Sequence, residues 1–559
     1  MSVPEEEIQF KQSHEAKKDE VSHFNFDANN RPTKGKQKSA PFLNFLRMGV
    51  NAGRGAGVIC VVVGAFLVVL GAAVLTNFTA TFQFILSRKV VLSSTAQGFP
   101  IWRDVSDHLD TKTAWYFFNL TNPKEFVQGT QPILQEVGPF WYKTILKKIN
   151  IEFLDNKTVT FEEHREFEFD AENSVLPNTT RITMINVPVM SALQRLKPLG
   201  YFARLAVDPI IKAAIADQQL TANYSVAELT YDGVYNNLVA LSKIKEGFLE
   251  AIFALNSKDN KKGKFGFGVD KHDPTTFNMF TGGTGVMDLN RIYSINHKHV
   301  LSMWPNIENT TCNIVDGTFG YLRPPMNESN EQKVYIPDMC RPVTIRYEKD
   351  VNTNGIRLRR FILGKENFYN REAEPANACY DEIYREPSGV AEAGPCKQGA
   401  PILLSMPHFM HADPSFSEKV IGMNADPERH TFIMDHEPMT GMTVTVRGRL
   451  QANFRVTQLD CLDGEKLPEL LMPLFWQELY VEAGPGIVAF LHRVLSYPGL
   501  AKIALIIVLL LGIIISIIGA GFLMNHSRRT RQTEQLNPTK YHKMATQEAT
   551  RKPELDQLV

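Results

Sequence analysis

Two stretches of the chain are apolar on every helical face. Residues 58–75 contain no charged side chain, and Ser516 is the only hydroxyl-bearing residue within 503–524. A helix that crosses about 30 Å of hydrocarbon needs about 20 apolar residues, whereas the helix of a soluble core keeps a polar face. The pattern therefore predicts two transmembrane helices, over residues 55–76 and 501–524.

Most of the segment between these helices has the pattern of β-strands. Residues 102–169 are rich in β-branched and aromatic residues, separated by Asn, Pro, Gly or Asp turns. Residues 159–169 (VTFEEHREFEF) alternate apolar and polar positions, which is typical of a half-buried strand. Strands return after Phe265 and continue to about Val456.

Residues 187–255 differ, because they are rich in Ala, Leu and Lys with apolar positions three or four apart. This spacing predicts helices, which Pro198 and Pro209 break into short pieces. We therefore expect an α+β membrane protein, in which a strand-rich domain at 77–500 carries a helical bundle and two transmembrane helices anchor it.

Basic residues beside the apolar stretches predict the orientation of the chain. About fifty polar residues precede the first stretch, so we interpret it as an uncleaved signal-anchor. Basic flanking residues mark the cytoplasmic side of a membrane. Such residues lie before the first span, at Arg47 and Arg54, and after the second, at Arg528, Arg529 and Arg531. Segments 1–54 and 525–559 are thus expected in the cytoplasm, although Lys502 on the other side of the second span is an exception.

Seven Asn-x-Ser/Thr triplets without a central proline lie between the spans, at Asn77, Asn119, Asn156, Asn178, Asn223, Asn309 and Asn327. Such triplets are acceptors for N-glycosylation on the exposed surface of secreted domains. Their position agrees with an extracellular or luminal domain. Asn525 also begins a triplet, but it lies on the predicted cytoplasmic side and should remain unmodified.

Five of the six cysteines lie in the same domain, which the predicted orientation places in an oxidising compartment. Four of them are close in sequence, at Cys312, Cys340, Cys379 and Cys396. Their spacing contains no CxxC pair, so a zinc site is not expected. Four cysteines allow three pairings, and spacing does not choose among them. Cys461 stands apart, and Cys60 is either an apolar filler of the first span or a lipidation site.

Charge and motifs exclude several classes of function. The chain has 60 basic and 60 acidic side chains, which argues against a nucleic-acid-binding protein. No nucleophile elbow, HExxH, Walker loop or dinucleotide fingerprint is present. A histidine group at His408, His411, His430 and His436 is the one candidate for metal or catalysis, and structural histidines explain it better. We expect that the protein is not an enzyme and that it binds no cofactor and no metal.

Lysines on the predicted helices are the candidates for ligand binding. Lys197, Lys212, Lys243 and Lys245 either form a surface that steers anions or are ordinary solvent-facing charges. The same alternatives hold for the basic run at 258–268.

Short segments along the domain resemble one known family. They are Tyr116-Phe117-Phe118-Asn119, Asn122–Phe126, Glu136–Phe140, Phe169-Asp170, Phe280-Thr281-Gly282, Pro407-His408-Phe409, Asp435–Gly441 and Arg449–Asn453. In this order, they are similar to those of the class B scavenger receptors. The resemblance extends from about Arg88 to the second span.

The resemblance implies an antiparallel β-barrel-like domain with a helical bundle at its apex, which is residues 187–255 here. It also implies an apolar tunnel toward the bilayer, and ligands such as lipids, fatty acids, sterols or lipoprotein particles. A protein ligand at the apex and a homo-oligomer are open alternatives. By the same resemblance, Cys312 pairs with Cys379 and Cys340 with Cys396, while Cys461 has no assigned partner.

Both tails bear on the location of the protein. The N-terminal segment is long and polar, and we expect it to be disordered. Tyr541–Met544 fits a tyrosine-based sorting signal, and Glu554–Val559 approaches an acidic dileucine signal. We expect a receptor at the plasma membrane that passes lipid to the bilayer. The alternative is a receptor in the endosomal or lysosomal membrane that sorts a luminal protein.

Overall fold

The computed structural model describes residues 54–196, 219–238, 263–268, 275–305, 311–397, 399–458 and 466–536, together with Pro209 and Ala213. The chain divides into two compact units, residues 71–507 and a second unit of residues 1–70 with 508–559. We describe each unit by itself.

The helices are α2 (Arg54–Thr76), α3 (Phe78–Lys89), α4 (Phe99–Arg103), α5 (Val105–His108), α6 (Pro123–Phe126), α7 (Val187–Leu196), α9 (Val226–Leu229), α12 (Pro414–Ser417), α13 (Pro427–His430) and α14 (Pro485–Leu536). The 3-10 turns are η2 (Val286–Asp288), η3 (Pro337–Met339), η4 (Lys365–Phe368), η5 (Pro375–Tyr380), η6 (Gly394–Cys396) and η7 (Pro407–Phe409).

The strands are β1 (Leu109–Leu120), β2 (Leu134–Phe153), β3 (Thr158–Phe169), β4 (Arg181–Ile185), β5 (Thr221–Ser225), β6 (Val234–Tyr235), β7 (Lys264–Phe265), β8 (Thr276–Phe280), β9 (Ile292–Ile295), β10 (Glu331–Ile336), β11 (Arg341–Thr353), β12 (Ile356–Leu363), β13 (Val390–Glu392), β14 (Ile402–Ser405), β15 (Ile433–His436), β16 (Thr443–Val456) and β17 (Leu470–Ala483).

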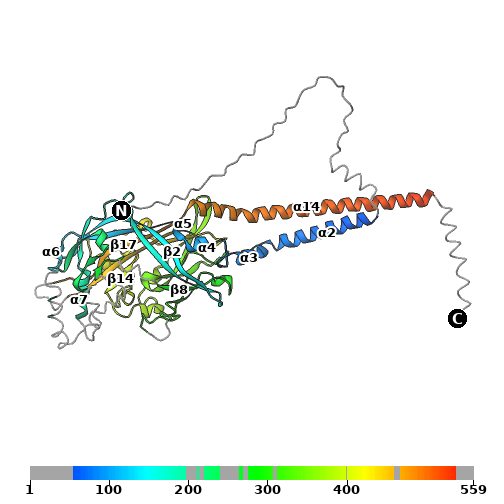
Figure 1. The fold of residues 1–559 in the computed structure, drawn as a ribbon. Coiled ribbons are helices and arrows are strands. Elements are labelled where there is room, and N and C mark those ends of the chain that lie inside the picture. The colour runs from blue at the N-terminus through cyan, green and yellow to red at the C-terminus, as the bar shows by residue number, and fades with distance from the viewer. Residues whose placement is uncertain are drawn as a thin grey trace, which may run out of the picture. The chain divides into compact units, whose positions relative to one another are not determined.

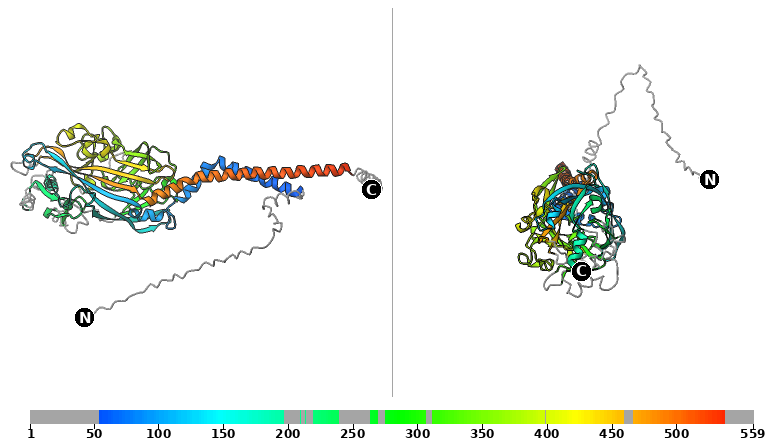
Figure 2. Two further views of the ribbon diagram at one scale, coloured as in Figure 1. Left: turned by 90° about the horizontal axis from the view of Figure 1, so that it is seen from above. Right: turned by 90° about the vertical axis from the view of Figure 1, so that its left-hand side faces the viewer.

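One antiparallel sheet of 13 strands organises the larger unit (Figure 1). Its order is β10-β11-β12-β15-β16-β17-β1-β2-β3-β8-β9, and β14 joins β13 to β16. The long strands run side by side in the left view of Figure 2. The first strand lies between the last strand and β2, and Leu109 of β1 pairs with Ala483 of β17. The chain therefore enters the sheet from α5 and leaves it toward α14 at the same end.

The core lies on both faces of β1. Ala114, Tyr116 and Phe118 belong to one buried cluster, whereas Trp115 and Phe117 belong to another. Successive residues of a strand point to opposite faces, so the apolar run of this strand reflects cover on both sides. Helices α6 and α7 lie at one end of the sheet, and α4 and α5 lie at the other (Figure 1).

The smaller unit contains the ends of α2 and α14, which contact each other through glycines. A Cβ atom on Gly519 would lie 2.8 Å from the Cβ of Cys60, and one on Gly512 would lie 2.9 Å from the carbonyl oxygen of Gly64. Small residues allow helices to approach closely within a membrane. Both helices are long and apolar enough to span a membrane, and only 11% of each apolar window is buried. In the core helix of a soluble protein, most of such a window would be buried.

Two predictions of local structure were wrong. Trp102, expected in a strand, lies in α4, which begins with a proline in its first turn and so has a favoured helix start. We expected strands to end near Val456, but β17 follows and pairs with β16. Between the two helical stretches predicted at 190–220 and 234–255, the structure has the strand β5, which pairs with β4; most of both stretches lies outside the described residues.

Helix α14 is also longer than the predicted span at 501–524, since it begins at Pro485. Its first turns carry Ile487 and Leu491, which are 3% and 0% exposed in a cluster with Ala483 of β17. Burial of these side chains against the sheet explains why the helix starts before the apolar stretch.

Candidate functional site

One buried face of β2 and β3, the face that carries Phe161, has charged residues among its aromatic ones. Lys148 lies opposite Glu163 in the ladder, and Leu146 lies opposite Arg165. Opposed residues, and those two positions further along, share one face of a sheet. Lys148, Glu163 and Arg165 therefore form a cluster on the same face as Phe161.

Lys148 is buried inside this face without a hydrogen-bonding partner. It is 3% exposed, and its Nζ has no partner among the described residues. The ammonium lies 4.6 Å from the ring centre of Tyr321, 5.1 Å from that of Trp102 and 5.7 Å from that of Phe161. Burial lowers the pKa of Lys148 to about 8, although attraction to Glu163 opposes this shift. Aromatic faces attract the cation but accept no conventional hydrogen bond from it.

Glu163 is already engaged by other residues. Tyr321 donates its hydroxyl hydrogen to Oε1 of Glu163 at 3.0 Å, and Arg165 donates to Oε2 at 2.5 Å. Burial alone would raise the pKa of Glu163, but Arg165 and Lys148 together lower it. The carboxylate is thus charged and hydrogen-bonded, and it faces the two positive charges of Lys148 and Arg165, while Asp338 also attracts Arg165.

A second polar cluster contains two of the predicted histidines. Nε2 of His408 lies 2.5 Å from Oε2 of Glu136, and the His408 and His430 rings stack at 4.5 Å. Trp476 and Arg429 also donate to Glu136, at 2.8 and 3.0 Å. Burial would raise the pKa of Glu136. The hydrogen bonds, above all that of His408, outweigh this effect and lower the pKa to about 2.

The ring nitrogens of this cluster do not fit a metal ion. Nδ1 of His408 accepts the backbone N–H of Asn424 at 3.0 Å, and Nδ1 of His430 accepts that of Asp426 at 2.9 Å. A neutral imidazole whose Nδ1 accepts must carry its hydrogen on Nε2, whereas histidine ligands usually donate from the nitrogen that does not bind the metal. The cluster is therefore a hydrogen-bonded support.

The other two predicted histidines lie apart from this pair. His411 is exposed, and His436 is hydrogen-bonded to Thr443 at 2.9 Å.

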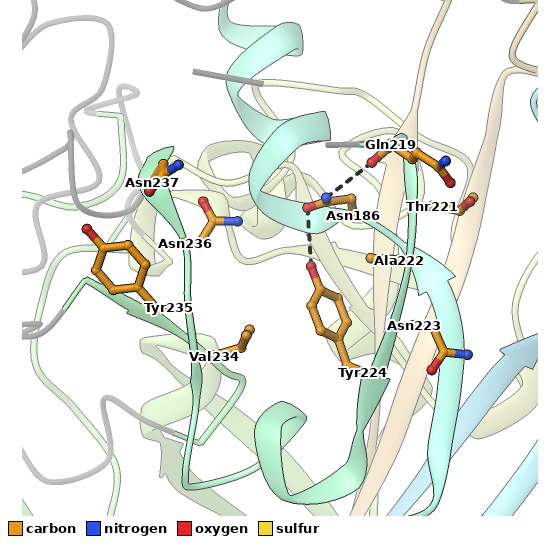
Figure 3. Close-up of a pocket in the computed structure, with 10 residues that line it drawn as sticks. All are labelled: Asn186, Gln219, Thr221, Ala222, Asn223, Tyr224, Val234, Tyr235, Asn236 and Asn237. Atoms are coloured by element: carbon orange, nitrogen blue, oxygen red, sulfur yellow. Dashed lines mark hydrogen bonds between the residues drawn. The ribbon is translucent and has the colours of Figure 1, made fainter. Parts of the chain in front are cut away.

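An open pocket of about 470 Å³ lies near α7, and the described residues that line it are uncharged. Its lining consists of amide, hydroxyl and small apolar side chains from Asn186, Gln219, Thr221, Ala222, Asn223, Tyr224, Val234, Tyr235, Asn236 and Asn237 (Figure 3). Within it, Asn186 donates to the Gln219 carbonyl at 3.1 Å and accepts from the Tyr224 hydroxyl at 3.4 Å. This lining could bind a neutral polar group.

The disulfide pairing in the structure is the one that the resemblance implied. Cys312 bonds Cys379 with a Cα–Cα distance of 6.4 Å, and Cys340 bonds Cys396 at 5.8 Å. Cys461 lies outside the described residues, as do all four predicted ligand-binding lysines, Lys197, Lys212, Lys243 and Lys245.

The predicted glycosylation acceptors differ in exposure. Asn77, Asn156 and Asn223 are exposed, Asn119, Asn178 and Asn327 are half-buried, and Asn309 lies outside the described residues. Asn119 lies within β1, where its side chain accepts the backbone N–H of Thr183 at 2.8 Å. We expect the exposed acceptors to be modified more readily than Asn119.

Sequence analysis missed the cluster of Lys148, Glu163 and Arg165, although a signal was present. In the alternating strand 159–169, one phase contains Phe161, Phe167 and Phe169, and the same phase contains Glu163 and Arg165. Charges in the apolar phase of a half-buried strand indicate a buried polar site.

Two apolar helices and a disulfide-bonded domain built on a large antiparallel sheet define a membrane protein with a sheet-rich domain. The family model described as "CD36 family" matches residues 62–523. The chain therefore belongs to the CD36 family.

Curated relatives agree with this assignment. Scavenger receptor class B member 1 of Cricetulus griseus is 28% identical over 421 residues, which cover 75% of this chain and 79% of the relative. Lysosome membrane protein 2 of Homo sapiens is 29% identical over 378 residues, covering 67% and 75%. Protein peste of Drosophila melanogaster is 27% identical over 448 residues, covering 78% and 75%.

Proposed function

We propose that this protein binds lipid or lipoprotein ligands and passes lipid through its sheet-rich domain to the membrane. The observation that carries the proposal is the row of aromatic side chains on one face of β1, β2 and β3, which includes Trp115, Phe140 and Tyr142. Phe161 is buried there, while Phe167 and Phe169 keep partly accessible surface. A lipid chain removed from water gains about 0.8 kcal/mol per buried CH₂ group, so such a face favours transfer without covalent chemistry.

The predicted orientation is part of this proposal. Both tails lie in the cytoplasm, and the sheet-rich domain lies outside the cell or in a lumen. Because β1 and β17 are paired at the end of the sheet where α14 begins, we propose that lipid leaves the domain at this end.

A transfer assay with a neutral lipid tests the proposal. The full chain is reconstituted in liposomes, and a fluorescent sterol is offered in donor particles. We expect sterol to enter protein-containing liposomes faster than protein-free ones, and to co-purify with the protein. If the protein neither retains nor transfers any lipid, the proposal is wrong.

Sorting of a luminal protein to lysosomes is a second candidate. It is favoured by the similarity to lysosome membrane protein 2 and by the Tyr541–Met544 segment of the tail. A luminal protein that co-purifies with the receptor, and that fails to reach lysosomes when Tyr541 is changed to Ala, would support it. Transfer of sterol with no such cargo would favour the first candidate.

A further inference from the structure

Two buried donors at the α4 end of the sheet lack acceptors. Nζ of Lys148 and Nε1 of Trp102 are both buried without a hydrogen-bond partner among the described residues. They are neighbours, because the ammonium lies 5.1 Å from the centre of the indole ring. A buried donor without an acceptor costs about 1–3 kcal/mol, and more when it is charged. Two such donors side by side indicate that something else accepts from them.

The nearby groups within the described part of the chain do not supply that acceptor. Glu163, the carboxylate facing Lys148, already accepts from Arg165 and from Tyr321. The walls around the ammonium are the rings of Trp102, Phe161 and Tyr321. The site thus offers hydrogen-bond donors, the positive charges of Lys148 and Arg165, and aromatic surface.

Arg165 gives this site an accessible side. Its guanidinium is paired with Glu163, yet 32% of its side chain is accessible, compared with 5% for Glu163. It lies two positions from Glu163 on the shared face, so it adjoins Lys148 across the ladder. A guanidinium has five N–H donors, and one carboxylate does not use them all.

We propose that Lys148, Arg165 and the indole N–H of Trp102 bind the anionic head group of an amphiphile, with its apolar chain along the aromatic face. This inference rests on the proposed lipid-binding function and names the head group that the domain selects. A carboxylate and a phosphate both provide the required acceptor and negative charge. The fatty acid and the phosphate-bearing lipid are therefore separate arms of the test.

The experiment compares probes that differ only in the head group. The full chain in detergent is titrated with oleate, with the neutral oleyl alcohol and with the phosphate-bearing lysolipid oleoyl lysophosphatidic acid. We expect the wild-type protein to bind at least one anionic probe at least tenfold more tightly than the alcohol. The tighter of the two anionic probes identifies the head group.

Variants of one strand provide the matched control. Lys148→Met should remove the preference for the anionic probe and leave alcohol binding unchanged, while Lys148→Arg should retain the preference. Lys147→Met is the control, because Lys147 lies on the same strand but is exposed. Trp102→Phe, which keeps an aromatic ring but removes the N–H donor and part of the ring surface, should weaken anion binding more than alcohol binding.

Each outcome has a defined meaning. The head-group site is wrong, while lipid binding stands, if Lys148→Met binds the anionic probes as tightly as the wild type does. The same holds if its affinity for the alcohol falls as much as its affinity for the anionic probes. If the wild-type protein binds none of the three probes, both this inference and the proposed function fail. Lys148→Met also removes the attraction to Glu163 and the contacts with three rings, so Lys148→Arg, which keeps the charge, separates loss of the head-group site from loss of stability.

Discussion

At the scale of single residues, burial holds two histidines in the neutral form. His430 is 1% exposed, and burial, with repulsion from His408 and Arg429, lowers its pKa to about 4. His436 is equally buried, and burial with Arg323 and Arg359 lowers its pKa to about 3. Each side chain has one ring nitrogen in a hydrogen bond and the other without a partner among the described residues. Their contribution to stability must therefore depend on pH.

The direction of this pH dependence of stability follows from the direction of the pKa shift. Because the pKa of His430 is lower in the folded state than the ordinary 6.5, the unfolded chain binds its proton first. The stabilisation is complete above about pH 6.5 and is lost as pH falls toward 4. The acidic range of endosomes and lysosomes falls in this window.

We predict that His430→Asn flattens this pH dependence, because the amide oxygen can still accept from Asp426 but does not titrate. Between pH 7.5 and 4, the wild type should lose on the order of 2–3 kcal/mol of unfolding free energy relative to the variant. Denaturant unfolding of the purified chain at several pH values measures this difference. The exposed His411→Asn is the control, and an equal loss in wild type and His430→Asn would contradict the prediction.

At the scale of elements, the two membrane helices are close because glycines face each other. A Cβ at Gly519 would lie 2.8 Å from that of Cys60, whereas Gly521 has no described atom within 4 Å of its Cβ position. Cβ atoms of a disulfide are about 3.5–4.5 Å apart, so a small adjustment would allow a bond at position 519.

We predict that Gly519→Cys forms a disulfide with the native Cys60 when membranes are oxidised, whereas Gly521→Cys does not. Proteolysis between the spans, followed by electrophoresis without reductant, would show whether the two ends stay linked. Linkage of Gly521→Cys but not of Gly519→Cys would mean that different faces of the helices meet. Larger residues at Gly64 or Gly512 should reduce the crosslink, because they separate the helices.

At the scale of the whole molecule, orientation in the membrane can be tested through glycosylation. Asn156 is exposed and lies between β2 and β3, in the domain predicted to be extracellular or luminal. Asn525 begins the same kind of triplet but follows the second apolar stretch. We predict that Asn156→Gln removes one glycan and that Asn525→Gln removes none. Electrophoretic mobility with and without glycosidase measures both, and the reverse result would invert the predicted orientation.

Some features follow from the sequence because they are local. The two spans need only a run of apolar residues, and β3 needs only alternation, so both were predictable. The missed strand β17 is instead almost continuously apolar, because both of its faces are covered. A pattern without alternation does not distinguish a buried strand from a buried helix.

The sequence by itself determined the two apolar helices, most long strands and, through short segments in order, the family. The tertiary structure decided which distant residues meet. Glu136 meets His408 across 272 positions, and Lys148 meets the ring of Tyr321 from another part of the chain. The physical reason is that periodicity reports only whether a position faces apolar surroundings. The partner of a buried charge depends on strand order and register, which long-range packing sets.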